Sequence, residues 1–373
     1  MRVLHFYKTA LPDSMGGIEQ VIDQIARGTA KLGVTTDVLS LSRNPSEQPV
    51  DMNGYRLHRA RLDFEVASTG FSAPVLPIFR RLAGQVDLIH YHFPWPFMDL
   101  VHFMARTRKP TLVTYHSDII RQKHLLKLYR PLERRFLADM HHIVATSPNY
   151  VATSDVLGRY RSKVSIIPIG LEKANYPQPC MERLRLWRSR FGPKFFLFVG
   201  VIRYYKGLHI LLEAAQETGF PIAIVGAGPI ELELKAQATR LGLTNIHFLG
   251  YLPDEDKVAL LQLSYAIVFP SHLRSEAFGI SLLEGAMYGK PMISSEIGTG
   301  TTFINVDRET GLVVPPDDAK ALRVAMQQLW GDEAEAARMG KRAEQRYWQL
   351  FTAQLMAERY MTLYRNLTRD SRG

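Results

Sequence analysis

The chain has 373 residues, which is long for one hydrophobic core and sufficient for two domains. Its 46% hydrophobic and 22% charged residues are typical of a soluble protein, and its net charge is +10. The single cysteine, Cys180, excludes an internal disulfide and a cysteine-rich metal site and fits a reducing compartment. The longest apolar stretch, residues 195–202, is too short to span a bilayer, and the chain begins in a strand-like run rather than a signal peptide. We therefore expect a cytoplasmic protein.

Apolar runs of strand length alternate with helical patterns in the first half of the chain. Helical periodicity covers residues 17–31 and 119–138. This alternation predicts βαβ units and a parallel sheet that is buried on both faces. The expected strands are residues 3–7, 36–41, 88–91, 111–115, 143–146 and 164–167.

The second half restarts the same alternation after a proline-containing linker and a short helix within residues 168–193. Beyond residue 317 the pattern is wholly helical and ends at 351–368. We expect an α/β fold of two doubly wound parallel-sheet domains that face a cleft, with ligands at the carboxyl ends of the strands. The expected strands are residues 195–199, 222–225, 246–248, 266–269, 292–294 and 312–314.

The positive charge is concentrated between residues 101 and 135, which hold nine basic and two acidic residues. Residues 119–136 within this stretch predict a basic amphipathic helix, which can lie on an anionic membrane surface. The same helix could bind nucleic acid or be a solvated face. No RNA- or DNA-binding motif accompanies it, so we expect membrane contact and no nucleic-acid partner. The basic residues are Arg121, Lys123, Lys127, Arg130, Arg134 and Arg135.

The segment S-E-A-F-G-I-S-L-L-E, residues 275–284, follows an apolar strand and begins a helical pattern. A helix that starts there directs free N–H groups and a positive dipole end toward one point. Glu276 would lie in the turn, and Glu284 two turns along the helix on about the same face. Phe278, Gly279 and Ile280 could offer their amides to an anion and several hydroxyls. Taken alone, the two carboxylates would favour an ordinary exposed helix with a glutamate at each end.

Arg203 and Lys206 follow the first strand of the second domain and precede a helix. A helix N-terminus is a poor place for uncompensated positive charge, which favours an anion site over a solvated pair. Two cations at this point could neutralise a diphosphate leaving group without a metal.

Two glycine-containing turns also lie between a strand and a helix. Gly16 and Gly17 would let the backbone approach a ligand, although a tight turn needs glycine in any case. Gly226 and Gly228 imitate a dinucleotide fingerprint, but Glu231 replaces its third glycine, and the next strand lacks the acidic residue that would bind a ribose. A nicotinamide cofactor is therefore not expected.

His116 ends the strand at 111–115, where it would face the cleft or cap a loop. The acidic triplet at residues 254–256 follows Pro253 and opens a helical pattern, so we interpret it as helix capping and dipole charge rather than a metal site. The sequence predicts no metal site.

These motifs occur together, in this order, and across nearly the whole chain. Together they resemble the motifs of the retaining glycosyltransferases of family 4, which have the GT-B fold. The set consists of Gly16-Gly17, His116, Arg203 with Lys206-Gly207, Gly226-Ala-Gly228-Pro229 and Glu276-x7-Glu284. The combination is specific, whereas no single member is. The opening residues 4–20 further resemble mannosyl- and rhamnosyltransferases of bacterial O-antigen synthesis.

The resemblance implies residues 1–170 as an acceptor-side domain, joined by a terminal helix at 351–373, and residues 171–350 as the nucleotide-sugar domain. Arg203 and Lys206 would bind the diphosphate, helped by the amides of the Gly16-Gly17 turn. Glu276 and the 278–280 amides would contact the hexose, with His116 on its other side. Glu284 would bind the ribose, Gly226 and Gly228 would shape a turn beside the nucleotide, and the base would lie near Leu252. Catalytic roles fall on His116, Glu276, Arg203 and Lys206.

The implied function is transfer of mannose or D-rhamnose from a GDP-sugar to an undecaprenyl-diphosphate-linked saccharide at the inner face of the plasma membrane, with retention and without a metal or other cofactor. A UDP-hexose donor on the same fold is one alternative. A sugar-nucleotide epimerase and a nucleotide-sensing module without turnover are the others.

Overall fold

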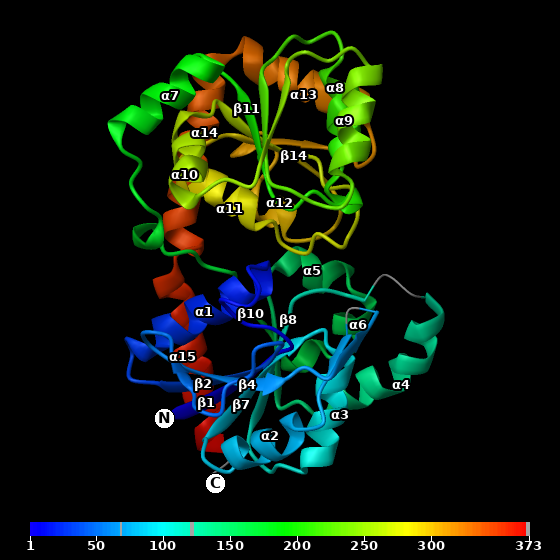
Figure 1. Cartoon of the computed structure of the whole chain (residues 1–373), viewed down its shortest axis with the longest axis vertical. Coiled ribbons are helices and arrows are strands. Elements are labelled where there is room, and N and C mark those ends of the chain that lie inside the picture. The colour runs from blue at the N-terminus through cyan, green and yellow to red at the C-terminus, as the bar shows by residue number, and fades with distance from the viewer. Residues whose placement is uncertain (68, 120–122, 371–373) are drawn as a thin grey trace. The chain divides into compact units, whose positions relative to one another are not determined.

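The computed structural model describes residues 1–67, 69–119 and 123–370 and divides into two compact units (Figure 1). The first unit is Met1–Gly170 together with the segment that begins at Ala353. The second unit is Leu171–Thr352. Each unit has its own sheet and its own core.

An eight-stranded sheet with the order β10-β9-β8-β7-β1-β2-β4-β3 forms the core of the first unit. All pairs in it are parallel except β3 with β4. All six residues of the central strand β7 are buried, as expected for a sheet covered on both faces. The strands are β1 (Arg2–Phe6), β2 (Thr35–Ser42), β3 (Val50–Asp51), β4 (Arg56–Arg61), β7 (Leu88–Phe93), β8 (Thr111–Tyr115), β9 (His142–Ala145) and β10 (Val164–Ile166).

The six strands expected in this half are present, but the sequence does not predict β3, β4 or a small antiparallel pair formed by β5 (Phe64–Val66) and β6 (Thr69–Phe71). Strand β4 reads R-L-H-R-A-R, and only Leu57 and Ala60 are buried in it. Because β4 lies near the edge of the sheet, most of its side chains can be polar. A search for apolar runs therefore does not find it.

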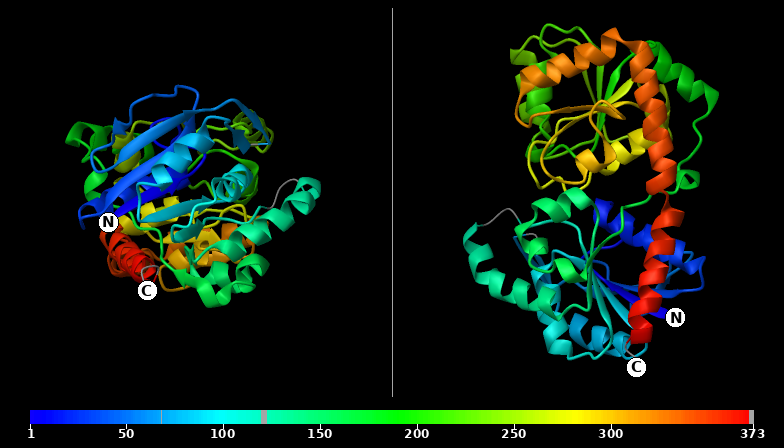
Figure 2. Two further views of the ribbon diagram at one scale, coloured as in Figure 1. Left: turned by 90° about the horizontal axis from the view of Figure 1, so that it is seen from below. Right: turned by 180° about the vertical axis from the view of Figure 1, so that it is seen from behind.

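The C-terminal helix α15 belongs to the first unit, where it packs against α1 and β7. The two helices lie side by side in Figures 1 and 2. Helix α15 begins at Ala353 rather than at residue 351, and it buries Tyr360 and Tyr364 against the sheet. The helices of this unit are α1 (Gly17–Ala30), α2 (Val75–Ala83), α3 (Pro96–Ala105), α4 (Lys123–Asp139), α5 (Pro148–Thr153), α6 (Asp155–Gly158) and α15 (Ala353–Asp370).

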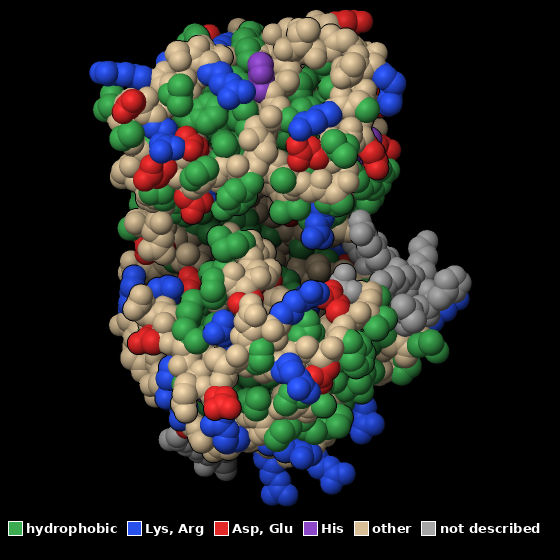
Figure 3. All heavy atoms as spheres, in the orientation of Figure 1, with side chains coloured by type: hydrophobic (Ala, Val, Ile, Leu, Met, Phe, Trp, Pro, Cys, Tyr) green, Lys and Arg blue, Asp and Glu red, His purple; other side chains and the backbone are tan. Residues whose placement is uncertain are grey.

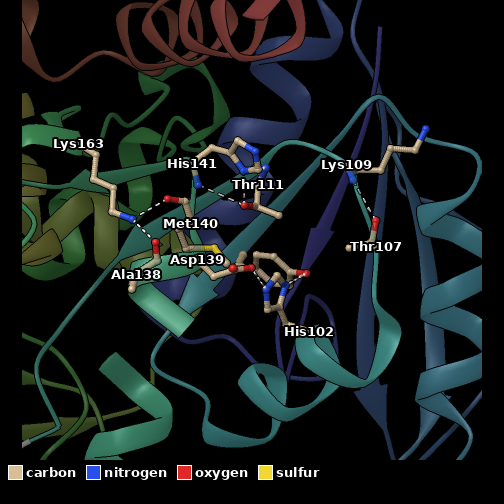
Figure 4. A network of polar contacts seen from close by, with 10 residues as sticks. His102, Thr107, Lys109, Thr111, Ala138, Asp139, Met140, His141 and Lys163 are labelled. Atoms are coloured by element: carbon tan, nitrogen blue, oxygen red, sulfur yellow. Dashed lines mark hydrogen bonds and ion pairs between the residues drawn. The ribbon is translucent and has the colours of Figure 1, made fainter. Parts of the chain in front are cut away.

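Helix α4 corresponds to the basic helix that the sequence predicts to begin at residue 119. It begins at Lys123, Ile119 is not helical, and Arg121 lies outside the described residues. Its end is fixed by hydrogen bonds from the Lys163 ammonium to the carbonyl oxygens of Ala138 and Met140, at 2.6 and 2.7 Å (Figure 4). A cation is well placed there, because the carbonyl end of a helix is negative.

The same end of α4 is joined to α3 and the sheet. Nε2 of His102 on α3 lies 2.8 Å from the Asp139 carboxylate, and Nδ1 of His102 lies 2.9 Å from the Tyr91 hydroxyl on β7 (Figure 4). Nearer its start, α4 leaves Lys127, Leu128 and Arg130 exposed.

The second unit contains a six-stranded parallel sheet with the order β13-β12-β11-β14-β15-β16. The chain starts at β11, winds outward to β13 and then returns to the other side of β11 as β14, so the sheet is doubly wound. All six strands lie where the sequence predicts them, with nearly the same bounds. They are β11 (Phe196–Val199), β12 (Ile222–Val225), β13 (Ile246–Gly250), β14 (Ala266–Phe269), β15 (Met292–Ser295) and β16 (Gly311–Val314).

Helices of the second unit follow the strands and cover the sheet (Figure 1). The expected linker helix is α7, and the acidic triplet forms the first turn of α10, as predicted. No described helix is long and apolar enough to cross a membrane. The helices are α7 (Met181–Phe191), α8 (Leu208–Ala215), α9 (Glu231–Arg240), α10 (Asp254–Leu263), α11 (Ile280–Met287), α12 (Thr301–Ile304), α13 (Ala319–Gly331) and α14 (Glu333–Leu350).

Charged side chains are distributed over both units. On the face drawn in Figure 3, Lys and Arg side chains are interspersed with acidic and uncharged ones and form no continuous basic surface.

Candidate functional site

The loops that leave the carboxyl ends of β11, β12 and β14 are packed backbone against backbone. A Cβ atom added to Gly226 would lie 1.9 Å from the carbonyl oxygen of Gly200, and one added to Gly228 would lie 2.0 Å from that of Ile202. The added Cβ of Gly207 would lie 2.0 Å from the carbonyl oxygen of Pro270. These glycines are therefore required for the close approach of three loops.

Lys206 and Glu276 meet in this packed region. The Lys206 ammonium forms an ion pair with the Glu276 carboxylate, and each residue is only 9% exposed. The Ser271 hydroxyl approaches the same carboxylate oxygen at 3.4 Å, and the ammonium lies 4.7 Å from the centre of the Phe269 ring. The pair holds a positive and a negative group at the carboxyl ends of two neighbouring strands, β11 and β14.

Arg203 caps the short 3-10 helix η3 (Tyr204–Lys206) but does not join this pair. Its side chain is exposed, and no hydrogen bond or ion pair to another described residue holds it. The structure therefore brings Lys206 and Glu276 together and leaves Arg203 available to a ligand from solvent.

The N-terminus of α11 carries unused N–H groups beside Glu276. Gly279 caps the helix with φ = +98°, a conformation that suits glycine. Within the described part of the chain, the amides of Phe278, Gly279 and Ile280 donate no hydrogen bond. These three amides therefore keep their hydrogen-bonding capacity for a ligand that reaches them, such as an anion or a hydroxyl.

Glu284 lies on α11, but its partners are residues that the sequence did not single out. Its Oε1 atom accepts a hydrogen bond from the Tyr176 hydroxyl at 3.0 Å and lies 3.2 Å from the Lys257 ammonium. Lys257 also pairs with Asp254, at 3.1 Å. Burial raises the pKa of Tyr176, and the Glu284 charge raises it further, so this hydroxyl stays protonated as a donor. The carboxylate of Glu284 is held in one orientation.

The predicted base-binding segment follows β13. Leu252 is half-buried in the turn before α10, and Tyr251 is 77% exposed. This turn is next to Gly226, whose N–H donates to the Gly250 carbonyl at 2.8 Å.

In the first unit, Gly16 caps α1, which begins at Gly17. The carboxylate of Glu19 folds back over this turn: an added Cβ at Gly16 would lie 2.3 Å from Oε2 of Glu19. The Thr9 hydroxyl donates to the other oxygen at 2.6 Å. A ligand anion approaching these amides would therefore meet a buried carboxylate, a feature that the sequence analysis did not foresee.

His116 follows β8 and belongs to a buried cluster of histidines. Its Nε2 atom lies 3.0 Å from Nδ1 of His92, and Nε2 of His92 lies 2.9 Å from Nδ1 of His5. Burial lowers the pKa of His116 and of His5 to about 3, so both imidazoles are neutral at pH 7. His116 therefore acts as a neutral hydrogen-bonding group rather than as a cation.

Two groups of described side chains have ligand atoms close enough together to hold a metal ion, and the sequence analysis singled out neither group. In the group of His5, His90 and His92, the ring nitrogens are hydrogen-bonded to one another or to neighbouring hydroxyls and His116. In the second group, His209, His272 and Asp317, the two ring nitrogens of His272 have no described partner.

Comparison with known proteins gives two family matches. The model described as Glycosyltransferase Family 4 matches residues 15–174, and that of Glycosyl transferases group 1 matches residues 187–346. The chain is 63% identical over 353 residues to D-rhamnosyltransferase WbpZ of Pseudomonas aeruginosa, and the aligned region covers 95% of this chain and 93% of that protein. It is 51% identical over 367 residues to O-antigen chain mannosyltransferase C of Escherichia coli, with 98% and 99% covered.

Solved structures show the same fold at much lower identity. Sucrose-phosphate synthase from Thermosynechococcus elongatus superposes with a TM-score of 0.82 at 22% identity and 99% coverage of both chains. Anabaena Alr3699/HepE in complex with UDP superposes with a TM-score of 0.78 at 18% identity, covering 98% of this chain and 100% of that one. The predicted GT-B fold is confirmed.

Proposed function

Because this chain belongs to glycosyltransferase family 4, we propose that it transfers mannose or D-rhamnose from a GDP-sugar to a lipid-diphosphate-linked saccharide, with retention, during O-antigen synthesis. The two relatives named for such sugars match almost the whole chain, which supports the sugar class and the pathway. D-Rhamnose is 6-deoxymannose, so one site can be shaped for either sugar.

The observation that carries the donor site is the Lys206–Glu276 pair beside the free amides of residues 278–280. A diphosphate that enters here meets the Lys206 ammonium, and Arg203 is free to reach it from solvent. Glu276 and the amides then bind hexose hydroxyls. Glu284, oriented by Tyr176 and Lys257, accepts hydrogen bonds from the ribose. The base lies near Leu252.

The chemical step follows from the charge that develops on the leaving group. The bond between the sugar C1 and the diphosphate oxygen breaks, and a bond from the acceptor oxygen to C1 forms on the same face. The acceptor proton passes to the departing diphosphate. Lys206 and Arg203 stabilise the negative charge that grows on this diphosphate, while Glu276 and the amides hold the oxocarbenium-like sugar.

No metal is required for this step in the proposal, because two cationic side chains replace it. Of the two metal-capable groups, neither includes Lys206, Glu276 or Glu284. Activity should therefore survive extensive chelation. If chelation abolishes turnover and zinc or magnesium restores it, the metal-free part of the proposal fails.

The acceptor is proposed to be an undecaprenyl-diphosphate-linked saccharide at the inner face of the plasma membrane. Exposed Lys127, Arg130 and Arg134 on α4, with Leu128 81% exposed among them, support contact with an anionic membrane.

A nucleotide panel tests the donor. We would measure the melting temperature with GDP, UDP, ADP and TDP, and we expect GDP alone to stabilise the protein strongly. Only a nucleotide that binds the native state well raises the melting temperature. Strong stabilisation by UDP instead would replace the proposed donor by a UDP-hexose.

The sugar is then tested by comparing GDP-mannose with GDP-D-rhamnose. A site that binds the mannose 6-hydroxyl would reject the sugar lacking it by about four powers of ten, whereas a rhamnose site would exclude mannose by only about a hundredfold. Incubation of each donor without acceptor provides the control: an isomerised donor would indicate an epimerase, and binding without turnover would indicate a sensor.

A further inference from the structure

A continuous series of buried hydrogen bonds joins the C-terminal helix α15 to His116 within the first unit. All of its side chains are at most 6% exposed. The distances between successive polar atoms are 2.8 Å (Tyr360 Oη to Thr114 Oγ1), 2.7 Å (Thr114 Oγ1 to His90 Nε2), 2.8 Å (His90 Nδ1 to Tyr364 Oη), 3.4 Å (Tyr364 Oη to His5 Nε2), 2.9 Å (His5 Nδ1 to His92 Nε2) and 3.0 Å (His92 Nδ1 to His116 Nε2).

Each member of this series carries one hydrogen to share. A neutral imidazole donates from one nitrogen and accepts at the other, and a hydroxyl donates one hydrogen. The direction of one bond therefore dictates the direction of the next, and the whole series has two ordered arrangements. In one, hydrogens point from α15 toward His116, and in the other they point from His116 toward α15.

Tyr360 decides between these arrangements. Its hydroxyl is buried, and Thr114 is its one hydrogen-bond partner within the described residues. If the hydrogens pointed toward α15, Thr114 would donate to Tyr360, and the Tyr360 O–H would have no acceptor. If they point toward His116, every O–H and N–H from Tyr360 to His92 has an acceptor, and the one donor left over is the Nδ1–H of His116, which is not fully buried. The second arrangement is favoured, because an unsatisfied buried donor is costly.

The arrangement determines the state of His116. Its Nε2 atom accepts from His92 Nδ1–H, so its own hydrogen is on Nδ1. Nδ1 has no hydrogen-bond partner within the described residues and is not among the fully buried unpartnered atoms, so it retains contact with solvent. His116 thus presents an N–H donor at the carboxyl end of β8.

We propose that Tyr360 and Tyr364 are positioning residues that hold His116 as its Nδ1–H tautomer, so that it donates a hydrogen bond to a substrate oxygen instead of acting as a base. The identity of that substrate rests on the proposed function, whereas the tautomer does not. Helix α15 would then have a chemical role in the first unit in addition to its packing.

Nuclear magnetic resonance of histidine labelled with ¹⁵N tests the tautomer directly, with His116→Asn used to assign the His116 signals. We expect the Nδ1–H form to exceed the Nε2–H form by roughly tenfold, the population ratio that corresponds to one unsatisfied buried donor. A predominant Nε2–H form, or a doubly protonated ring at pH 7, would overturn the proposal.

Tyr364→Phe tests the role of α15, because it removes the hydroxyl between His5 and His90. We expect the two tautomers of His116 to approach equal populations, because either direction then leaves Nε2 of His5 as a buried donor or acceptor without a partner. Tyr55→Phe is the matched control: it removes another buried hydroxyl of the same unit, bonded to Asp23 at 3.1 Å, and should leave the ratio unchanged. An unchanged ratio in folded Tyr364→Phe would contradict the proposal.

If Tyr364→Phe does not fold, Thr114 offers the same test. Thr114→Val removes the hydroxyl that links Tyr360 to His90 and should shift the ratio, whereas Thr114→Ser keeps a hydroxyl and should restore it. Failure of serine to restore the ratio would assign the effect to packing.

Turnover tests the donor role. Asn can place an N–H near the position of the imidazole Nδ1, and Gln near that of Nε2, so His116→Asn should retain at least about tenfold more activity than His116→Gln. Equal loss in both would overturn the donor role. If the protein uses a donor other than a GDP-sugar, the tautomer measurements keep their meaning, so the two hypotheses fail separately.

Discussion

The Lys206 ammonium and the Glu276 carboxylate form a buried ion pair although 70 positions separate them in the chain. Lys206 follows β11 and Glu276 follows β14, and these strands are neighbours in the sheet. Each charge compensates the other while no ligand is bound. A diphosphate that approaches Lys206 would therefore bind a group that is already oriented, and Glu276 would remain beside the sugar that the diphosphate carries.

Replacing the cations tests their role in catalysis. Arg203→Ala and Lys206→Ala should each lower kcat/KM by about two to three powers of ten, the usual cost of losing a donor that stabilises transition-state charge. Steady-state kinetics with the cognate donor measures this. Wild-type turnover in both variants would exclude the proposed electrostatic role.

The two variants should differ in stability. Lys206→Ala leaves the buried Glu276 charge without its partner and should lower the free energy of unfolding by about 3 kcal/mol. Arg203 is exposed and holds no described partner, so its replacement should change stability by less than about 0.5 kcal/mol. Urea denaturation distinguishes them, and equal stability losses would contradict the difference in environment.

Sequence patterns predicted the apolar strands and the residues at their ends, because apolar runs and glycine turns are local signals, but they missed β3, β4 and the β5–β6 pair. They could not predict Tyr176 and Lys257 as partners of Glu284. Tyr176 is 108 positions from Glu284, and nothing in its local sequence marks it for a binding site. The buried histidines were missed for a similar reason: His5 and His90 look like ordinary strand residues until β1 and β7 are paired.

The packed glycines should tolerate no side chain. Gly226→Ala and Gly228→Ala place a Cβ about 2 Å from a carbonyl oxygen and should each lower the free energy of unfolding by at least about 3 kcal/mol. Gly331→Ala is the control, because an added Cβ there meets nothing within 4 Å. Denaturation of the three variants measures the effect, and a stable, folded Gly228→Ala would refute the close approach.

Tyr176 should contribute to nucleotide affinity through Glu284. Tyr176→Phe removes one hydrogen bond that orients the carboxylate and should weaken binding of the cognate nucleotide about fivefold, or about 1 kcal/mol. Tyr288→Phe is a close control, because the Tyr288 ring lies 6.3 Å from that of Tyr176 but its hydroxyl has no described hydrogen-bond partner. Calorimetric titration should show the loss in the first variant alone, and equal affinities would argue against a ribose-binding role for Glu284.

Asp37 should make the protein sensitive to acid. Burial raises its pKa, but hydrogen bonds from His58 and Arg2 and the charges of Arg2 and Arg56 outweigh this and lower the pKa to about 2. A carboxyl whose pKa is depressed by folding stabilises the native state above its unfolded pKa, here 3.8, and loses that contribution as the pH falls toward 2. The contribution is about 2 kcal/mol.

Urea denaturation between pH 6 and pH 2 would measure this contribution. Asp37→Asn should be less stable than the wild-type protein at pH 6, because Arg2 and Arg56 lose their partner. The difference between the two proteins should shrink as the pH falls below about 4. A difference that stays constant to pH 2 would show that Asp37 is not the titrating group.

The exposed face of α4 should determine membrane binding. Reversing Lys127, Arg130 and Arg134 to Glu removes three attractive charges, each worth about 1 kcal/mol near an anionic surface, and adds three repulsive ones. Partitioning onto anionic liposomes should therefore fall by at least about a hundredfold, as sedimentation would show. Reversal of Arg185, Arg188 and Arg190 on α7 changes the net charge equally and is the matched control. If both triple variants lose binding to the same extent, net charge rather than α4 governs attachment, and membrane contact through this helix is wrong.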